Sequence, residues 1–209
     1  MCWCSYVDSG TKELTKQIVF NPNQEISRIY KKDYYKIFKL GISGYIWNHI
    51  YDLLLIKEHN IRFDESTDYA EDALFNNEYL KYCDCISFVN KSLYNYYVSS
   101  ESGLSHKYFP EFYDKLKEVY LSRIDYIEKK YLPEFCYEYF YLFNKSLKNT
   151  FDKRNKKNFF KKLKYNNYVI NDSIFKDCIS NMKVPDEDKK YVNLLKKGNY
   201  LLVYLIDKL

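Results

Sequence analysis

The first forty residues combine a strand-like start with a helix-like hydrophobic stripe. Met1 to Tyr6 is apolar and aromatic and predicts a strand. The turn signal Asp8-Ser9-Gly10 leads to a candidate returning strand, Ile18 to Phe20. Asn23 to Leu40 predicts a helix, because its apolar residues fall on one stripe at helical spacing. These residues are Ile26, Ile29, Tyr30, Tyr34, Ile37 and Phe38.

The middle of the chain mixes short helices with short strands. Gly41 to Gly44 ends the first helical pattern, and a short aromatic segment, Tyr45 to Tyr51, follows it. The next pattern predicts two helices and three strands. The helices are Asp52 to His59 and Asp72 to Tyr82, and the strands are Ile61 to Phe63, Ile86 to Val89 and Leu93 to Val98.

The pattern changes after the polar loop Ser99 to His106, where apolar residues begin to recur at helical spacing. From there to the end we expect helices only. Their expected ranges are about 108–131, 134–149, 155–168, 171–181, 187–197 and 199–208. The hydrophobic pattern therefore predicts an α/β fold, with a mixed layer of helices and strands over residues 1–106 and an all-helical C-terminal region over residues 107–209.

Composition supports a globular protein, since 46% of the 209 residues are hydrophobic and 29% are charged. Met1 to Gly10 lacks the basic head and apolar run of a signal peptide. Tyr200 to Ile206 is far shorter than the ~20 residues that span a bilayer. We therefore expect a cytoplasmic protein whose six cysteines are reduced thiols. The Cys-x-Cys pairs lack the spacing of zinc ligands.

The most informative stretch runs from Trp47 to Ser105. It contains WNHIY, IRFDE, an ED pair that opens a predicted helix, a strand, LYNY and a Ser-containing loop. This order and spacing resemble the acceptor-side, C-terminal part of bacterial family 2 glycosyltransferases that make capsular and surface polysaccharides. Met1 to Phe20 resembles, more weakly, the preceding hairpin. The resemblance implies an incomplete GT-A-like layer and transfer of a sugar, with inversion, from a nucleotide sugar to a saccharide or lipid-linked acceptor.

The same resemblance implies which residues carry the chemistry. A neutral hydroxyl is a poor nucleophile, so a carboxylate must take its proton as the new bond forms. Asp72 corresponds to that general base, and Glu71 to a residue that helps to position the acceptor. Trp47 would bound the acceptor pocket, and His106 is a candidate ligand for the catalytic metal. The simpler alternatives are that Asp72 caps its helix, that Trp47 is a core residue and that His106 lies on the surface.

The chain also departs from the family pattern. His49 stands where Lys is usual, and Asp52 where a basic residue is common, so acceptor contacts through them are in doubt. The donor-binding half that ends in a DxD motif has no counterpart in the chain. Asp186 to Asp188 follows Pro185 and predicts a helix start. We expect a divalent metal, Mg²⁺ or Mn²⁺, in the complete enzyme and no tight metal or donor binding to this chain alone.

A basic block extends from Lys145 to Lys164, with nine Lys or Arg and one acidic residue, Asp152. Phenylalanines lie between these lysines, and such a helix suits an anionic membrane surface. A solvated helix face is the alternative. No RNA-recognition motif accompanies the charge, so we expect no nucleic acid partner. The alternative function is a non-catalytic helical interaction protein that binds a membrane surface or another anionic partner.

Overall fold

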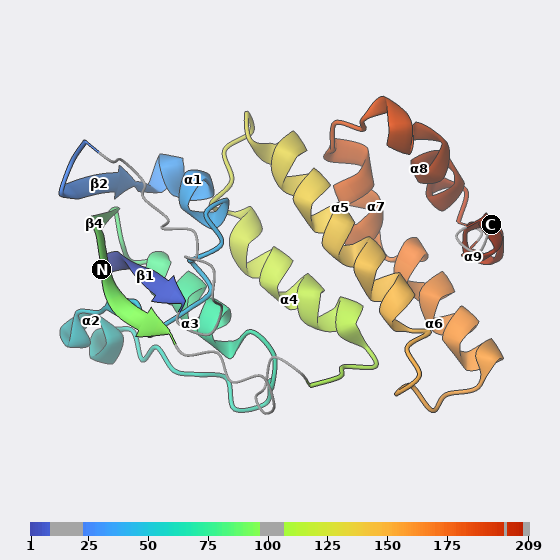
Figure 1. Cartoon of the computed structure of the whole chain (residues 1–209), viewed down its shortest axis with the longest axis horizontal. Helices are drawn as coiled ribbons and strands as arrows, with labels where there is room; N and C mark the ends of the chain where they lie inside the picture. Colours follow the sequence, from blue (N-terminus) through green and yellow to red (C-terminus); the bar gives the residue numbers. More distant parts are fainter. Residues whose placement is uncertain (9–22, 97–106, 199, 207–209) are drawn as a thin grey trace. The chain divides into compact units, whose positions relative to one another are not determined.

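The chain divides into two compact units. The computed structural model describes residues 1–8, 23–96, 107–198 and 200–206. The N-terminal unit comprises Met1–Lys107 and Ser122–Tyr126, and the helical unit comprises Tyr108–Leu121 and Ile127–Leu209. Figure 1 shows the strands of the first unit and the successive helices of the second.

The N-terminal unit is built on a small mixed sheet. Its strands are β1 (Cys2–Asp8), β2 (Ile26–Tyr30), β3 (His49–Ile50) and β4 (Cys85–Tyr96), in the order β2-β4-β1-β3. β1 runs parallel to β4, whereas the other two pairs are antiparallel. The predicted strand at Met1 to Tyr6 is therefore confirmed, and it pairs with a strand more than eighty residues later.

The two faces of this sheet differ strongly in exposure. Residues that alternate along β2 and β4 form a buried inner face, consisting of Ser27, Ile29, Ile86 and Phe88. The register places Ile26, Tyr30 and Ile50 on the opposite, outer face. Their exposed fractions are 60%, 51% and 73%. The outer face therefore presents large apolar side chains to solvent.

Short helices complete this unit. They are the 3-10 helix η1 (Lys31–Asp33), α1 (Tyr34–Phe38), α2 (Leu53–Glu58) and α3 (Glu71–Leu80). Burial of Phe75 and Tyr79 on α3 against Ile61 and Cys83 forms one core cluster. The buried Tyr34 hydroxyl donates to the Cys83 carbonyl at 2.8 Å, which joins α1 to the segment that follows α3.

The prediction of a single helix over Asn23 to Leu40 is wrong. Its first part is β2, where burial alternates, so Ile29 is buried and Ile26 is exposed. A spacing of three residues would place these two isoleucines on one face of a helix. Pairing with β4 places them on opposite faces of a strand. Only the second part, α1, is helical.

Two further strand predictions need correction. Ile61 to Phe63 is not a strand, because Ile61 closes α2 with a hydrogen bond from its amide to the Ile56 carbonyl at 3.0 Å. The two strands predicted over residues 86–98 are one strand, β4, along which β1 shifts its register on either side of Ser5. The candidate strand Ile18 to Phe20 and residue 98 lie outside the described residues.

The helical unit is formed by helices throughout its described residues, as predicted. α4 (Phe112–Ile124) belongs largely to it, and the helices that follow are α5 (Leu132–Asn149), α6 (Phe159–Asn171), α7 (Ser173–Asn181), η3 (Asp186–Asp188), α8 (Lys189–Lys196) and α9 (Tyr200–Ile206). Aromatic side chains fill its core, and Phe143 packs against Tyr113 and Phe175. None of the helices in the described part of the chain is both long and apolar enough to cross a bilayer.

Candidate functional site

The predicted base lies in the first turn of α3. The N-cap position belongs to Ala70, whose side chain cannot cap and whose φ of 57° is left-handed. Glu71 and Asp72 are the first two residues of the helix, so Asp72 does not occupy the N-cap. Its carboxylate instead accepts a hydrogen bond from the backbone amide of Ile46. A left-handed conformation at a non-glycine residue costs about 1–3 kcal/mol and is characteristic of functional sites.

The environment of Asp72 suits a proton acceptor. Partial burial raises the pKa of Asp72 above its ordinary value, and the neighbouring charge of Glu71 raises it further. The hydrogen bond from the Ile46 amide opposes both effects. A general base works best when its pKa approaches the working pH while the group stays ionised. The combination of burial, a like charge and one hydrogen bond moves Asp72 in that direction.

The segment that precedes α2 is held against α3 by a buried asparagine. Asn76 is fully buried, and its amide donates to the carbonyls of Ser43 at 3.0 Å and Tyr45 at 2.8 Å. Its carbonyl oxygen accepts from the Tyr51 hydroxyl at 2.5 Å. The Tyr79 hydroxyl, one helical turn later, accepts from the Asp52 amide at 2.9 Å. These bonds fix residues 43–52 against the middle and end of α3, and the Ile46 amide of the same segment reaches Asp72 in the first turn.

Trp47 is part of a stack of three aromatic rings. Its ring centre lies 4.8 Å from that of Tyr45 and 4.7 Å from that of Tyr94, and both pairs are nearly parallel. Trp47 is only partly buried, so it is neither a fully enclosed core residue nor an isolated surface ring. Tyr94 comes from β4 and is 38% exposed. Neither Tyr45 nor Tyr94 is among the residues to which the family resemblance gives a role, although Tyr94 lies within the LYNY string.

Part of the chain is similar in sequence to a glycosyltransferase. The sequence is 27% identical over 94 residues, or 45% of the chain, to a Bacillus subtilis (strain 168) protein described as the uncharacterized glycosyltransferase EpsJ. The matched segment spans 27% of the length of that protein. No protein-family model matches the chain. Over the matched segment, the chain is similar to a glycosyltransferase.

The two departures from the family pattern have structural explanations. Asp52 is the N-cap of α2 and accepts a hydrogen bond from the Leu54 amide at 2.9 Å. His49 lies in β3, and burial lowers its pKa to about 3, so its ring is neutral at physiological pH. Neither side chain presents a cation, and both have roles within the fold.

The predicted metal ligand His106 lies outside the described residues. Among the residues that the structure does describe, no group of three or more His, Cys, Asp or Glu side chains could hold a metal ion. Asp186 to Asp188 forms η3 directly before α8, which confirms the predicted helix start. All six cysteines are free thiols.

Proposed function

We propose that this chain is the acceptor-side part of a family 2 glycosyltransferase of GT-A type that acts in surface polysaccharide biosynthesis. The observation that carries the proposal is the partly buried Asp72 carboxylate, which contacts the backbone amide of Ile46, the residue between Tyr45 and Trp47 of the aromatic stack. The similarity to a glycosyltransferase over 94 residues supports it independently. The substrates are a nucleotide sugar and a saccharide or lipid-linked acceptor.

The proposed reaction uses Asp72 as the general base. The acceptor hydroxyl oxygen attacks the anomeric carbon as the carboxylate of Asp72 takes the hydroxyl proton. The bond between that carbon and the diphosphate oxygen breaks, and the nucleoside diphosphate leaves with the bonding electrons. Attack from the face opposite the leaving group inverts the anomeric centre. Glu71 positions the acceptor, and the rings of Tyr45, Trp47 and Tyr94 form one wall of its pocket.

The donor and its divalent metal bind, in this proposal, to residues outside this chain. Two observations support a separate donor-binding part. The similar glycosyltransferase is much longer than the matched segment, which spans 27% of its length. The outer face of the sheet also exposes Ile26, Tyr30 and Ile50, which a second protein layer could cover. Calorimetric titration of this chain with sugar nucleotides and Mn²⁺ should show no tight binding, and micromolar affinity would contradict this assignment.

The central test replaces Asp72 by Asn in the complete enzyme, formed by joining the chain to the donor-binding part of a similar glycosyltransferase. Asn keeps the shape and can accept the Ile46 hydrogen bond, but it cannot take a proton at neutral pH. Turnover should therefore fall by roughly 10²–10⁴ while the melting temperature does not fall. Glu71→Gln should reduce turnover less, because it alters placement of the acceptor only.

Asp84→Asn provides the matched control, because Asp84 is an exposed aspartate just beyond α3. It should leave turnover unchanged. If Asp72→Asn transfers sugar at nearly the wild-type rate, or loses activity only because it unfolds, Asp72 has no part in the mechanism. The alternative, a non-catalytic interaction protein, would then be favoured.

A further inference from the structure

Part of the basic block between Lys145 and Lys164 is neutralised within the helical unit. Arg154 donates two hydrogen bonds of 2.9 Å to the carboxylate of Asp152. Lys157 forms an ion pair with Glu111 at 2.7 Å. Arg154 and Lys157 therefore form ion pairs within the fold, and their charges do not indicate an external partner.

Three other lysines, Lys156 before α6 and Lys161 and Lys164 in its first two turns, lack such an explanation. Lys156, Lys161 and Lys164 are exposed, and they form no ion pair with any residue that the structure describes. Positive charges near the N-terminus of a helix are disfavoured by the helix dipole. The dipole therefore disfavours Lys156 and Lys161, which lie just before and within the first turn of α6, and an anionic partner would offset that cost.

Large apolar side chains are exposed beside these lysines. Phe160 is 79% exposed, and it lies one helical turn before Lys164 on the surface of α6. On α9, Leu201 and Leu205 are 50% and 51% exposed and also lie one turn apart. Contact between Phe159 of α6 and Tyr204 of α9, whose ring centres are 5.7 Å apart, joins the two helices. We call the residues Lys156, Phe160, Lys161, Lys164, Leu201 and Leu205 the α6–α9 surface.

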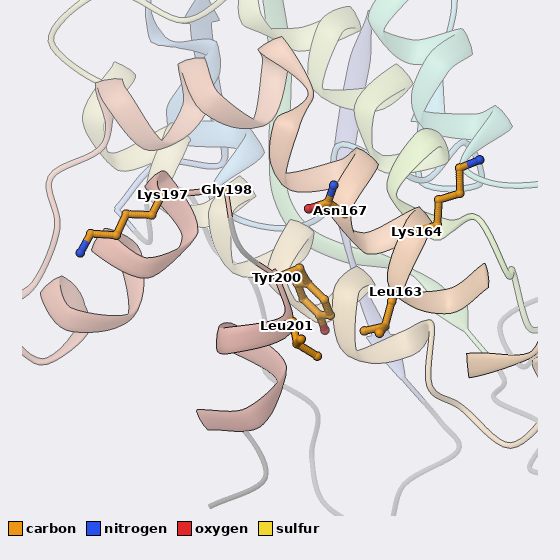
Figure 2. Close-up of a pocket in the computed structure, with 7 residues that line it drawn as sticks. All are labelled: Leu163, Lys164, Asn167, Lys197, Gly198, Tyr200 and Leu201. Carbon is orange, nitrogen blue, oxygen red and sulfur yellow. The ribbon is translucent and has the colours of Figure 1, made fainter. Parts of the chain in front are cut away.

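A pocket of about 530 Å³ opens within this surface. Figure 2 shows Leu163, Tyr200 and Leu201 close together, with Lys164 and Lys197 extending away from them on either side. Asn167 also lines the pocket, which thus combines apolar and polar walls with a lysine on either side. That arrangement suits a molecule with an apolar body and anionic groups.

From these observations, we propose that the α6–α9 surface docks the helical unit on an anionic lipid bilayer. Aromatic and aliphatic side chains bury into the boundary between head groups and acyl chains, while lysines contact anionic head groups. A nucleic acid fits less well, because Leu201 and Leu205 cannot stack on bases. A second copy of the chain fits less well too, because its lysines would face these lysines. The proposal does not depend on the glycosyltransferase activity.

The test sediments the full chain with vesicles of phosphatidylglycerol and phosphatidylcholine, and with vesicles of phosphatidylcholine alone. The chain should bind the anionic vesicles and be released by salt. Replacing Lys156, Lys161 or Lys164 by Gln should weaken binding about fivefold each, which corresponds to about 1 kcal/mol per lysine. Phe160→Ser, with every charge kept, should weaken it by roughly tenfold or more.

Tyr141→Ser is the matched control, since Tyr141 is an aromatic residue of α5 that is 69% exposed. It should leave vesicle binding unchanged. Leu205→Ser provides a second apolar variant, and circular dichroism of each variant reports whether the helices are intact. Equal losses in Phe160→Ser and Tyr141→Ser, or equal binding to both kinds of vesicle, would overturn the proposal.

Two other outcomes would also overturn it. Light scattering without lipid could reveal a dimer that Phe160→Ser abolishes, in which case the surface joins two copies of the chain. The chain could instead ignore vesicles and bind a single-stranded RNA oligonucleotide through the same lysines. Binding that is confined to anionic vesicles and lost in the lysine and Phe160 variants supports the lipid surface.

Discussion

Asn76 should be the residue that fixes the candidate acceptor segment in place. Asn76→Ala removes two donated hydrogen bonds to backbone carbonyls and one accepted from Tyr51. Since Asn76 is fully buried, water cannot easily replace these partners. Each net hydrogen bond contributes about 1 kcal/mol, and each buried group left unsatisfied costs about 1–3 kcal/mol. We expect the free energy of unfolding of the N-terminal unit to fall by roughly 3–5 kcal/mol.

Asn77 provides the matched control because it is the next residue and equally buried. Its side-chain amide nitrogen donates to the Ser122 hydroxyl at 2.7 Å, and its side-chain oxygen Oδ1 accepts no hydrogen bond from the described residues. Asn77→Ala should therefore cost only about 1 kcal/mol. The comparison separates the bonds to residues 43–51 from the general cost of truncating a buried asparagine.

Tryptophan fluorescence during urea denaturation measures the free energy of unfolding of the N-terminal unit. The chain has two tryptophans, Trp3 and Trp47, and both belong to the N-terminal unit. A double-mutant cycle with Tyr51→Phe should give a coupling free energy of about 1 kcal/mol with Asn76→Ala. If Asn76→Ala and Asn77→Ala cost the same, or if the coupling is zero, the anchoring role of Asn76 is refuted.

Three further predictions concern titratable groups. Burial lowers the folded pKa of His49 from 6.5 to about 3, so between these values the unfolded chain binds a proton that the folded chain does not. The free energy of unfolding should therefore rise with pH across that window, by up to about 1.4 kcal/mol per pH unit, and His49→Gln should flatten the rise. Asp172 caps α7 and forms an ion pair with Lys117, and its pKa is lowered. Asp172→Ala should lower the free energy of unfolding, followed by circular dichroism, by about 2–3 kcal/mol. In the wild type, the stabilisation from the Asp172 carboxylate should disappear as the pH falls through that lowered pKa. The raised pKa of Asp72 means that its ionisation opposes folding as the pH rises, so Asp72→Asn should melt no lower than wild type at neutral pH in thermal scans.

Several features could be predicted from the sequence because they depend on near neighbours. Helices after residue 107 follow from apolar residues spaced three and four apart, which place one face in the core. The helix start at Pro185 follows from a fixed proline φ and from acids in the first turn. The helix that begins with Glu71 and Asp72 was also predictable, with its first residue displaced by one.

The sequence also contained the residues of the candidate site without their arrangement. Asp72 and Trp47 could be singled out by their resemblance to a family. That the Ile46 amide contacts Asp72, and that Tyr94 stacks on Trp47, depends on segments distant in sequence. The sequence did not indicate the role of Asn76, because a buried asparagine cannot be distinguished from an exposed polar residue of a helix until its hydrogen-bond partners are known.

Tertiary structure decided the sheet and the geometry of the site. Ile26 and Ile29 fit a helical stripe, and only pairing with β4 made that segment a strand with one isoleucine inside and one outside. A helix satisfies its backbone hydrogen bonds within a few residues, so local sequence can specify it. A strand satisfies them on another strand: β1 finds its parallel partner in β4, more than eighty residues away, and no local pattern can specify that pairing.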